Sequence, residues 1–311
     1  NRGFPLTEPD RLRELLENAD AAGRRLAIHA IGDRAIDRLV DDMREIAGDT
    51  VADRRFRIEH YQHPTRSAIE ATADAGIIAS AQPYHAIDDG RWLEGHIGAE
   101  RARTTYAFRS IIDTGGILTF GSDWPVAPLS PLKGVYAAVT RRTIDDAYPD
   151  GWQPQEKITV EQALAAYTRN NAYAVFEEAE GGTLEVGKRA DLVVLGADPR
   201  RIAPERIPEL SVVETVIVSI GHEWMGTGLL LDAVCQPVGV GVLVAVPGAV
   251  ADRRAGLLQG LQHQVADEAR IDTEQHRHVV RHTVGDGEIG DLVAIEILDR
   301  HGQEILGGAG E

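Results

Sequence analysis

Residues 24–33 read RRLAIHAIGD, and residues 55–63 read RFRIEHYQH. In both, a short apolar run ends in polar and ionisable side chains, and a helix-like stretch follows. The same arrangement returns in GIIASAQPYH at residues 76–85 and in GILTFGSDWP at residues 116–125. Strands that alternate with helices at this spacing are typical of a parallel sheet with crossover helices. The sequence therefore predicts an α/β fold.

The stretches between these runs have the periodicity of amphipathic helices. Between residues 34 and 48, five apolar side chains recur at helical spacing: Ile36, Leu39, Val40, Met43 and Ile46. Asp33 stands where it can cap this helix. Further helices are expected at residues 65–76, in a segment that ends near Asp113, and at residues 130–142 and 160–173.

The number of units leaves two architectures open. Four strand–helix units are half of an eight-stranded TIM-type (β/α) barrel, but they can also form an open four-stranded sheet, and the pattern alone favours neither. The positions of the reactive side chains favour the barrel. His29, His60 and Asp123 each lie at the carboxyl end of an apolar run, and active sites of barrels are assembled at the carboxyl ends of the strands.

These three side chains suit a metal site. Two neutral imidazoles and one carboxylate are ligands for zinc, manganese or iron(II). A metal held by them lowers the pKa of bound water to roughly 7, and a neighbouring carboxylate can take the proton and pass it to a leaving amine. A single histidine at a strand end is more often structural, but three coordinating side chains at equivalent strand ends are harder to explain in that way.

The pattern changes after the helix expected at residues 160–173. GGTLEVGKRADLVVLGADP at residues 181–199 and SVVETVIVS at residues 211–219 indicate short strands around turns, as in a small β subdomain. From about residue 220 the sequence follows neither pattern. We therefore divide the chain into half of a barrel domain at residues 1–175, part of a β subdomain at residues 176–219, and an unassigned tail, disordered or frameshifted, at residues 220–311.

Composition and charge exclude several classes of partner. The formal net charge of −17 repels a phosphate backbone, so we expect no nucleic-acid partner. Cys235 is the only cysteine, which excludes an internal disulfide and a thiolate-rich metal cluster. Residues 229–250 are apolar, but Asp232 and Pro237 make them a poor membrane span. We expect a cytoplasmic protein with no membrane partner, and we treat a chain that begins with Asn1 as a fragment whose N-terminus and any signal peptide are not seen.

Five motifs of the chain resemble those of the amidohydrolase superfamily, and within it the YtcJ-like (amidohydrolase 3) group. They are IHAIGDRAID, RIEHYQH, SAQPYHAIDD, FGSDWPV and GTLEVGKRADLVVL, and they occur in the order of the family. The resemblance extends from near Arg11 to about Ser219. It implies a partial barrel that holds about strands five to eight of eight, followed by the small β subdomain and the tail.

The resemblance also implies a metal centre. His29 and His60 match the metal ligands on barrel strands five and six. Asp123 matches the residue after strand eight that binds the metal or its water and acts as general acid and base. The implied cofactor is a divalent metal, most often zinc, with one or two ions, and with manganese or iron as alternatives. Trp124 and Pro125 are expected to fix the following turn by packing.

Five further residues match family positions that face the substrate. Gln82, His85 and Asp88 lie in the stretch after strand seven, and Arg109 and Ser110 precede strand eight. For these five, a role in loop structure or capping is as good an explanation as direct contact with a small amide substrate.

The chain departs from the family in its first residues. Full-length members carry an HxH pair on strand one and a bridging residue on strand four, and nothing before His29 matches either element. The leading hypothesis is a metal-dependent hydrolase that splits non-peptide C–N bonds of an amide or cyclic amide through metal-activated water, and that needs the missing N-terminal half to complete its barrel. The alternative is a catalytically inactive, truncated relative with a binding or regulatory role.

Overall fold

Four short strands form a parallel sheet, and each lies in one of the four apolar runs of the sequence. The computed structural model describes residues 5–220, 241–244 and 277–282. Its first sheet has the order β1-β2-β3-β4, and every neighbouring pair is parallel. The strands are β1 (Ala27–Ala30), β2 (Arg57–His60), β3 (Ile78–Ala81) and β4 (Ile117–Phe120). The predicted α/β fold with a parallel sheet is confirmed.

The register of these strands aligns their carboxyl ends. Ala30 pairs with His60, and Ala81 pairs with Phe120. Because all four strands run in the same direction, the residues that follow them emerge along one edge of the sheet. The sequence order of the strands is also their spatial order, so each crossover leads to the adjacent strand.

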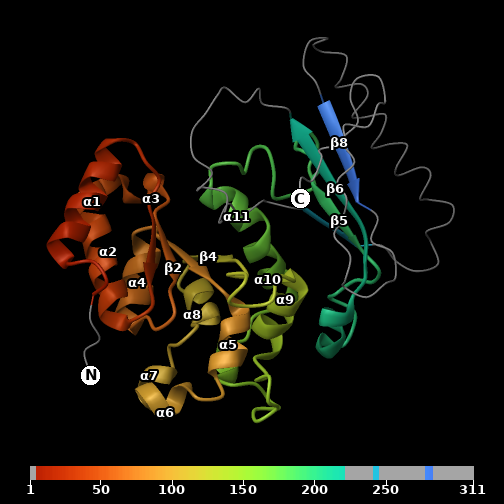
Figure 1. Cartoon of the computed structure of the whole chain (residues 1–311), viewed down its shortest axis with the longest axis horizontal. Helices are drawn as coiled ribbons and strands as arrows, with labels where there is room; N and C mark the ends of the chain where they lie inside the picture. The colour runs from red at the N-terminus through yellow and green to blue at the C-terminus, as the bar shows by residue number, and fades with distance from the viewer. Residues whose placement is uncertain (1–4, 221–240, 245–276, 283–311) are drawn as a thin grey trace, which may run out of the picture.

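Helices at the N-terminal side pack on one another and on the sheet. α1 packs on α2, and α2 packs on β1 and α4 (Figure 1). These elements and the two short helices between them are α1 (Pro9–Ala21), α2 (Asp33–Ala47), η1 (Gly48–Thr50), α3 (Val51–Arg54) and α4 (Arg66–Asp74). The predicted apolar face of α2 is confirmed, since Ile36, Leu39, Val40 and Met43 are buried and Ile46 packs against them.

The predicted cap of α2 is wrong by one residue. Gly32 is the N-cap and provides no side chain, whereas Asp33 is the first residue of the helix. The Asp33 carboxylate accepts a hydrogen bond from the Arg34 backbone N–H at 2.7 Å. A carboxylate in the first turn still stabilises the helix, because it lies close to the positive end of the helix dipole.

Several helices follow β3 and β4. After β3 come α5 (Pro83–Asp89), α6 (Leu93–Ile97), α7 (Ala99–Ala102) and α8 (Phe108–Asp113); after β4 come α9 (Pro131–Thr140), η2 (Pro154–Glu156), α10 (Val160–Tyr167) and α11 (Arg169–Ala174). The helix predicted at residues 160–173 is therefore interrupted at Thr168. None of the described helices is both long and apolar enough to cross a bilayer.

α10 and α11 cover the outer edge of the parallel sheet. Both pack on β4. The side-chain amide of Asn170 donates to the Leu118 carbonyl at 2.8 Å, and that of Asn171 donates to the Phe120 carbonyl at 3.0 Å. These hydrogen bonds satisfy two backbone carbonyls of an edge strand, which would otherwise be open to another chain.

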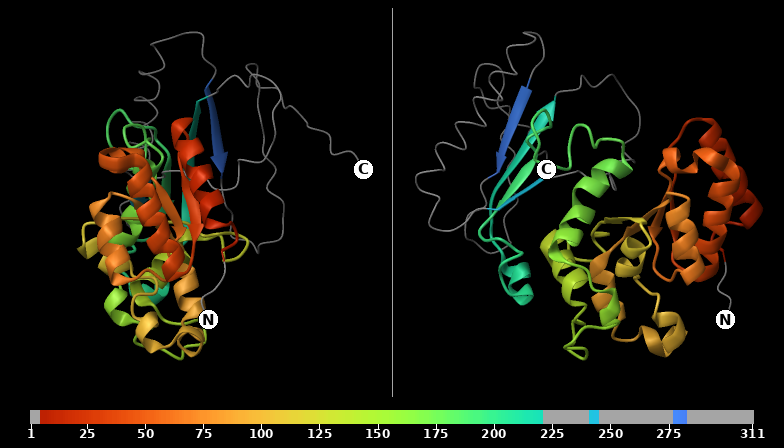
Figure 2. Two further views of the ribbon diagram at one scale, coloured as in Figure 1. Left: turned by 90° about the vertical axis from the view of Figure 1, so that its left-hand side faces the viewer. Right: turned by 180° about the vertical axis from the view of Figure 1, so that it is seen from behind.

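A second sheet lies beyond α9, α10 and α11 (Figures 1 and 2). Its order is β7-β5-β6-β8. The strands are β5 (Leu192–Leu195), β6 (Val212–Ile220), β7 (Gly241–Val244) and β8 (Arg277–His282), with η3 (Pro204–Glu209) between β5 and β6. Two of its strands, β7 and β8, come from residues 220–311, the region predicted as a tail, and the division of the chain into domains stays a prediction. The rest of residues 221–311 lies outside the described residues.

A wholly buried arginine joins α9 to the loops that follow α7 and precede η2. The Arg141 guanidinium donates to the backbone carbonyls of Trp152 at 2.7 Å and Tyr106 at 2.9 Å, and more weakly to that of Thr105 at 3.4 Å. Burial lowers the pKa of Arg141 to about 10, against the opposing effect of Glu156, so the side chain remains charged at neutral pH.

We predict that Arg141→Met strongly destabilises the protein. The Tyr106 carbonyl keeps the Phe108 N–H as a donor, whereas the variant removes the guanidinium donors of the Trp152 and Thr105 carbonyls. The free energy of unfolding is expected to fall by at least about 2 kcal/mol, since each buried carbonyl left without a donor costs about 1–3 kcal/mol. Urea unfolding followed by circular dichroism measures the change. The matched control is Arg103→Met, whose side chain is 71% exposed and for which we expect a change within about 0.5 kcal/mol. Equal stability of the two variants would contradict the anchoring role of Arg141.

Candidate metal centre

The strand ends carry the predicted ligands in a constrained backbone. His29 lies in β1, and His60 is the last residue of β2. Asp123 comes three residues after the end of β4. His60 has a φ of 71° and Asp123 a φ of 57°, a left-handed conformation that is uncommon for residues other than glycine. Such backbone conformations cluster at functional sites, where the surrounding structure holds them in place.

Three side chains converge at this edge of the sheet. One ligand atom each from His60, His85 and Asp123 lies within 4.8 Å of the other two. Nε2 of His85 is 3.7 Å from Oδ2 of Asp123. The His29 ring meets the His60 ring edge-on, with 4.4 Å between the ring centroids. Two of the three predicted ligands, His60 and Asp123, thus lie together with His85, which the sequence placed among the substrate contacts. His29 contacts His60 but is not one of these three converging side chains.

The geometry fits a divalent cation. Nε2 of His85 is buried and has no hydrogen-bond partner among the residues that the structure describes, and 3.7 Å is too long for a hydrogen bond to Asp123. Two atoms bound to one zinc ion at about 2.1 Å lie roughly 3.4 Å apart in a tetrahedral site. An ion between the two side chains would therefore satisfy a buried nitrogen for which the described part of the chain provides no hydrogen-bond partner.

The protonation states of His29 and His85 also favour a metal site. Burial lowers the pKa of His29, and the neighbouring His60 lowers it further, while Asp123 acts in the opposite direction. Burial also lowers the pKa of His85, against the opposing charges of Asp123 and Asp89. Neutral imidazole is the form that binds a metal, so these shifts keep two rings in the ligand form at neutral pH.

The predicted substrate contacts have protein partners of their own. Gln82 is buried, and its side-chain oxygen is 2.9 Å from Nδ1 of His60. Asp88 pairs with Arg91, and Arg109 pairs with Asp113. The Ser110 hydroxyl donates to Glu156 at 2.6 Å. Gln82 and His85 are thus tied to the cluster, whereas the contacts of Asp88, Arg109 and Ser110 lead away from it, and substrate contact by all five stays a prediction.

The sequence reading missed Asp89. Its carboxylate accepts hydrogen bonds from the Gln62 side chain, at 2.7 Å, and from the Tyr106 hydroxyl. Burial raises the pKa of Asp89, although both hydrogen bonds oppose the shift. Helical spacing does not separate the two aspartates, because Asp88 and Asp89 lie three and four residues after His85 in α5. Their partners do separate them, since Asp88 carries an ion pair with Arg91.

A comparison with known proteins assigns the family. The profile of the Amidohydrolase family matches residues 2–218, which is more than half of the chain. The chain belongs to the amidohydrolase family. The resemblance carried by the five motifs, including that to the YtcJ-like group, is confirmed.

Several known proteins are similar to this chain over about two thirds of its length. Protein LONG AFTER FAR-RED 3 of Arabidopsis thaliana is 39% identical over 64% of this chain and 34% of its own length. Putative amidohydrolase YtcJ of Bacillus subtilis is 29% identical, over 69% and 40% respectively. N-substituted formamide deformylase of Arthrobacter pascens is 32% identical, over 66% and 38%. The chain therefore spans less than half the length of each of these relatives.

A solved structure supports the fold. An uncharacterised metal-dependent hydrolase from Pyrococcus furiosus superposes with a TM-score of 0.52 at 30% identity, over 61% of this chain and 37% of that one. The matched region of the amidohydrolase chain therefore has the α/β architecture of a metal-dependent hydrolase.

The turn after Asp123 differs from the expectation. Trp124 was expected to pack, but its side chain is 62% exposed, so that expectation is wrong. The turn is held by the backbone instead, because the Asp123 carbonyl accepts hydrogen bonds from the N–H groups of Val126 at 2.8 Å and Ala127 at 3.4 Å. Backbone hydrogen bonds of this kind do not depend on the identity of the side chain at position 124.

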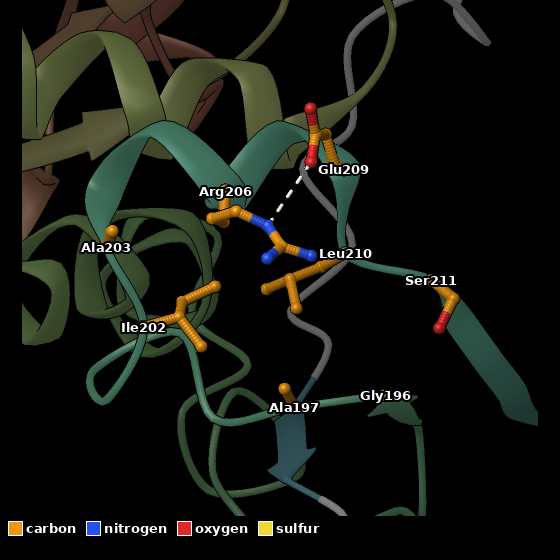
Figure 3. A pocket seen from close by; sticks show the side chains of 8 residues that line it. All are labelled: Gly196, Ala197, Ile202, Ala203, Arg206, Glu209, Leu210 and Ser211. Atoms are coloured by element: carbon orange, nitrogen blue, oxygen red, sulfur yellow. Dashed lines mark ion pairs between the residues drawn. The ribbon is translucent and has the colours of Figure 1, made fainter.

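A separate hollow of about 460 Å³ lies next to the second sheet (Figure 3). It is lined by the loop after β5 and by η3, and an ion pair between Arg206 and Glu209 borders it at 3.4 Å. No side chain of the metal centre contributes to its lining. The hollow is therefore distinct from the candidate site, and its exposed ion pair does not indicate a ligand.

We predict that His63 makes the protein less stable in acid. Its Nδ1 lies 3.0 Å from Oγ1 of Thr105, and burial lowers the pKa of His63 to about 4 against the opposing charge of Asp33. Between about pH 6.5 and pH 4 the unfolded chain binds more protons than the folded one, so stability falls on acidification, by up to roughly 3 kcal/mol.

His63→Asn isolates this effect, because asparagine keeps a donor near the position of Nδ1 but does not titrate. Urea unfolding at pH 7 and pH 4.5 should show a smaller loss of stability in the variant than in the parent chain. His29 and His85 contribute to both measurements, so the difference between the two proteins belongs to His63. Equal losses in the two proteins would disprove the prediction.

Proposed function

We propose that this chain carries part of the active site of a metal-dependent hydrolase that splits the C–N bond of a small amide or cyclic amide. The observation that carries the proposal is the convergence of His60, His85 and Asp123 on one centre at the carboxyl edge of the sheet. Membership of the amidohydrolase family and the metal-dependent hydrolase from Pyrococcus furiosus support a hydrolase with a divalent metal. The named substrate of the Arthrobacter relative, an N-substituted formamide, supports the amide class.

Each residue of the cluster has a defined task. His60, His85 and Asp123 would hold the cation, with His29 as a further ligand beside His60, and their mixed nitrogen and oxygen donors suit zinc, with manganese or iron as alternatives. When bound, such a cation lowers the pKa of a water molecule to roughly 7 and polarises an amide carbonyl. The Asp123 carboxylate would accept the proton of that water and deliver it to the leaving amine.

We predict that Asp123→Asn abolishes turnover without unfolding the protein. Loss of a general acid–base group lowers the rate by roughly 10²- to 10⁴-fold. Zinc-dependent release of amine from a panel of N-substituted formamides and cyclic amides measures the rate, with the chain joined to the rest of its reading frame and with thermal unfolding as the check on folding. The control is Asp53→Asn, an exposed aspartate in α3, for which we expect parental activity. If Asp123→Asn retained zinc-dependent turnover, Asp123 would not have this role. If the parent protein were inactive both with and without zinc, the non-catalytic binding or regulatory alternative would be favoured.

We further propose that the four parallel strands are about strands five to eight of a (β/α) barrel. Their spatial order equals their sequence order and each crossover returns to the adjacent strand, as in successive units of such a barrel. β1 and β4 each have one strand neighbour among the described residues. In this proposal the remaining strands, and the remaining metal ligands, come from outside this chain.

Joining the chain to the rest of its reading frame tests this proposal. We expect the joined protein to bind zinc more tightly and to unfold more cooperatively, because the joined part would pair with β1, which has one strand neighbour among the described residues, and would complete the ligand set. Competition with a chromophoric chelator and urea unfolding measure the two effects. A monodisperse chain that by itself binds zinc equally tightly and unfolds in one cooperative step would contradict the proposal.

A further inference from the structure

The buried side-chain amide of Gln82 contacts the His60 ring. Gln82 follows β3, and its side chain is 6% exposed. Its Oε1 lies 2.9 Å from Nδ1 of His60. An amide oxygen can only accept a hydrogen bond, so the ring nitrogen must be the donor. In this contact the neutral His60 ring carries its proton on Nδ1, and the lone pair of Nε2 is left for another partner.

The backbone of Gln82 also holds His85. Gln82 is the N-cap residue of α5, and Pro83 occupies the first position of the helix. The backbone N–H of His85 donates to the Gln82 carbonyl at 3.2 Å. One buried residue therefore fixes a side chain at the end of β2 through its amide and the first turn of α5 through its carbonyl. The rings of His60 and His85 are near-parallel, at 12°, with centroids 6.4 Å apart.

We propose that Gln82 is a positioning residue, which locks His60 in the Nδ1-protonated tautomer and turns its Nε2 toward the space shared with His85 and Asp123. The inference rests on the proposed function, because it takes that space as the cation site. A histidine ligand is commonly oriented by a hydrogen-bond partner on its second ring nitrogen. A carboxylate partner makes the ring a more basic metal ligand than a neutral partner does. Gln82 supplies the orientation while adding no negative charge to the centre.

This role differs from substrate contact in what a substitution changes. Loss of the amide frees the His60 ring to rotate and to exchange tautomers, whatever the substrate. Gln82→Glu keeps the shape and the acceptor but adds charge, whereas Gln82→Met keeps the approximate volume and removes the acceptor. A residue that only contacts substrate would leave the tautomer and the metal affinity of the two variants unchanged.

Two measurements test the proposal. They use the chain by itself, or the chain joined to the rest of its reading frame if the chain alone is not soluble enough. Nitrogen-15 NMR of the metal-free protein reports the His60 tautomer, with assignment by His60→Asn. Competition with a chromophoric chelator reports the zinc affinity. In the parent we expect the Nδ1-protonated ring, and in Gln82→Met a mixture of tautomers and a zinc affinity lower by roughly 10- to 100-fold. We expect Gln82→Glu to retain the tautomer and to bind zinc at least as tightly as the parent.

The matched control is Gln162→Met, which removes a side-chain hydrogen bond of similar length, 2.9 Å to the Thr159 backbone, at the start of α10. It should leave the tautomer and the zinc affinity at parental values. An Nε2-protonated His60 in the parent, or a parental zinc affinity in Gln82→Met, would overturn the proposal. Failure of the proposed function gives a different pattern, in which the parent binds no zinc while the Nδ1-protonated ring and its dependence on Gln82 persist.

Discussion

The structure depends on parallel pairing of four short strands in an aligned register. Each strand is only four residues long, so there is little room for a shift before pairing is lost. Because Ala30 pairs with His60 and Ala81 with Phe120, the segments that follow the four strands leave the sheet along one edge. Left-handed backbone conformations at His60 and Asp123 then turn the chain at that edge. The convergence of distant side chains follows from these two constraints.

Buried polar groups fix the loops beneath this edge. Arg141 binds three backbone carbonyls of two loops, and Asp89 receives hydrogen bonds from Gln62 and Tyr106. Tyr106 belongs to both sets, through its carbonyl and its hydroxyl. A buried polar network with its partners present holds its parts rigidly, because any local movement exposes an unpaired group to a medium of low dielectric constant. We therefore expect the loops that carry these groups to be rigid.

The opposite end of the sheet is tied to the helices beyond β4. The Arg55 guanidinium, just before β2, lies 3.8 Å from the centroid of the Tyr173 ring and binds the Glu178 carboxylate through two hydrogen bonds, at 2.8 and 2.6 Å. The Arg25 side chain, just before β1, donates to the Val175 carbonyl at 2.7 Å. Since α11 packs on β4, these contacts link the first two strands to the fourth. The segment from residue 173 to 178 thus braces the sheet at its amino ends.

The four strands, the apolar face of α2 and the family can all be predicted from the sequence, because local periodicity and motifs such as FGSDWPV are properties of short segments. It also placed His29, His60 and Asp123 at strand ends, since the end of an apolar run is visible in one dimension. The sequence did not show that His85 lies with Asp123 or that Gln82 binds His60. Nor did it show that Asp89, and not Asp88, binds Gln62 and Tyr106. Those facts depend on the direction in which side chains leave α5 and β3, which is set by packing between segments far apart in the sequence. Strands β7 and β8 were missed for the same reason: a strand is defined by its partner, and their partners lie in β5 and β6.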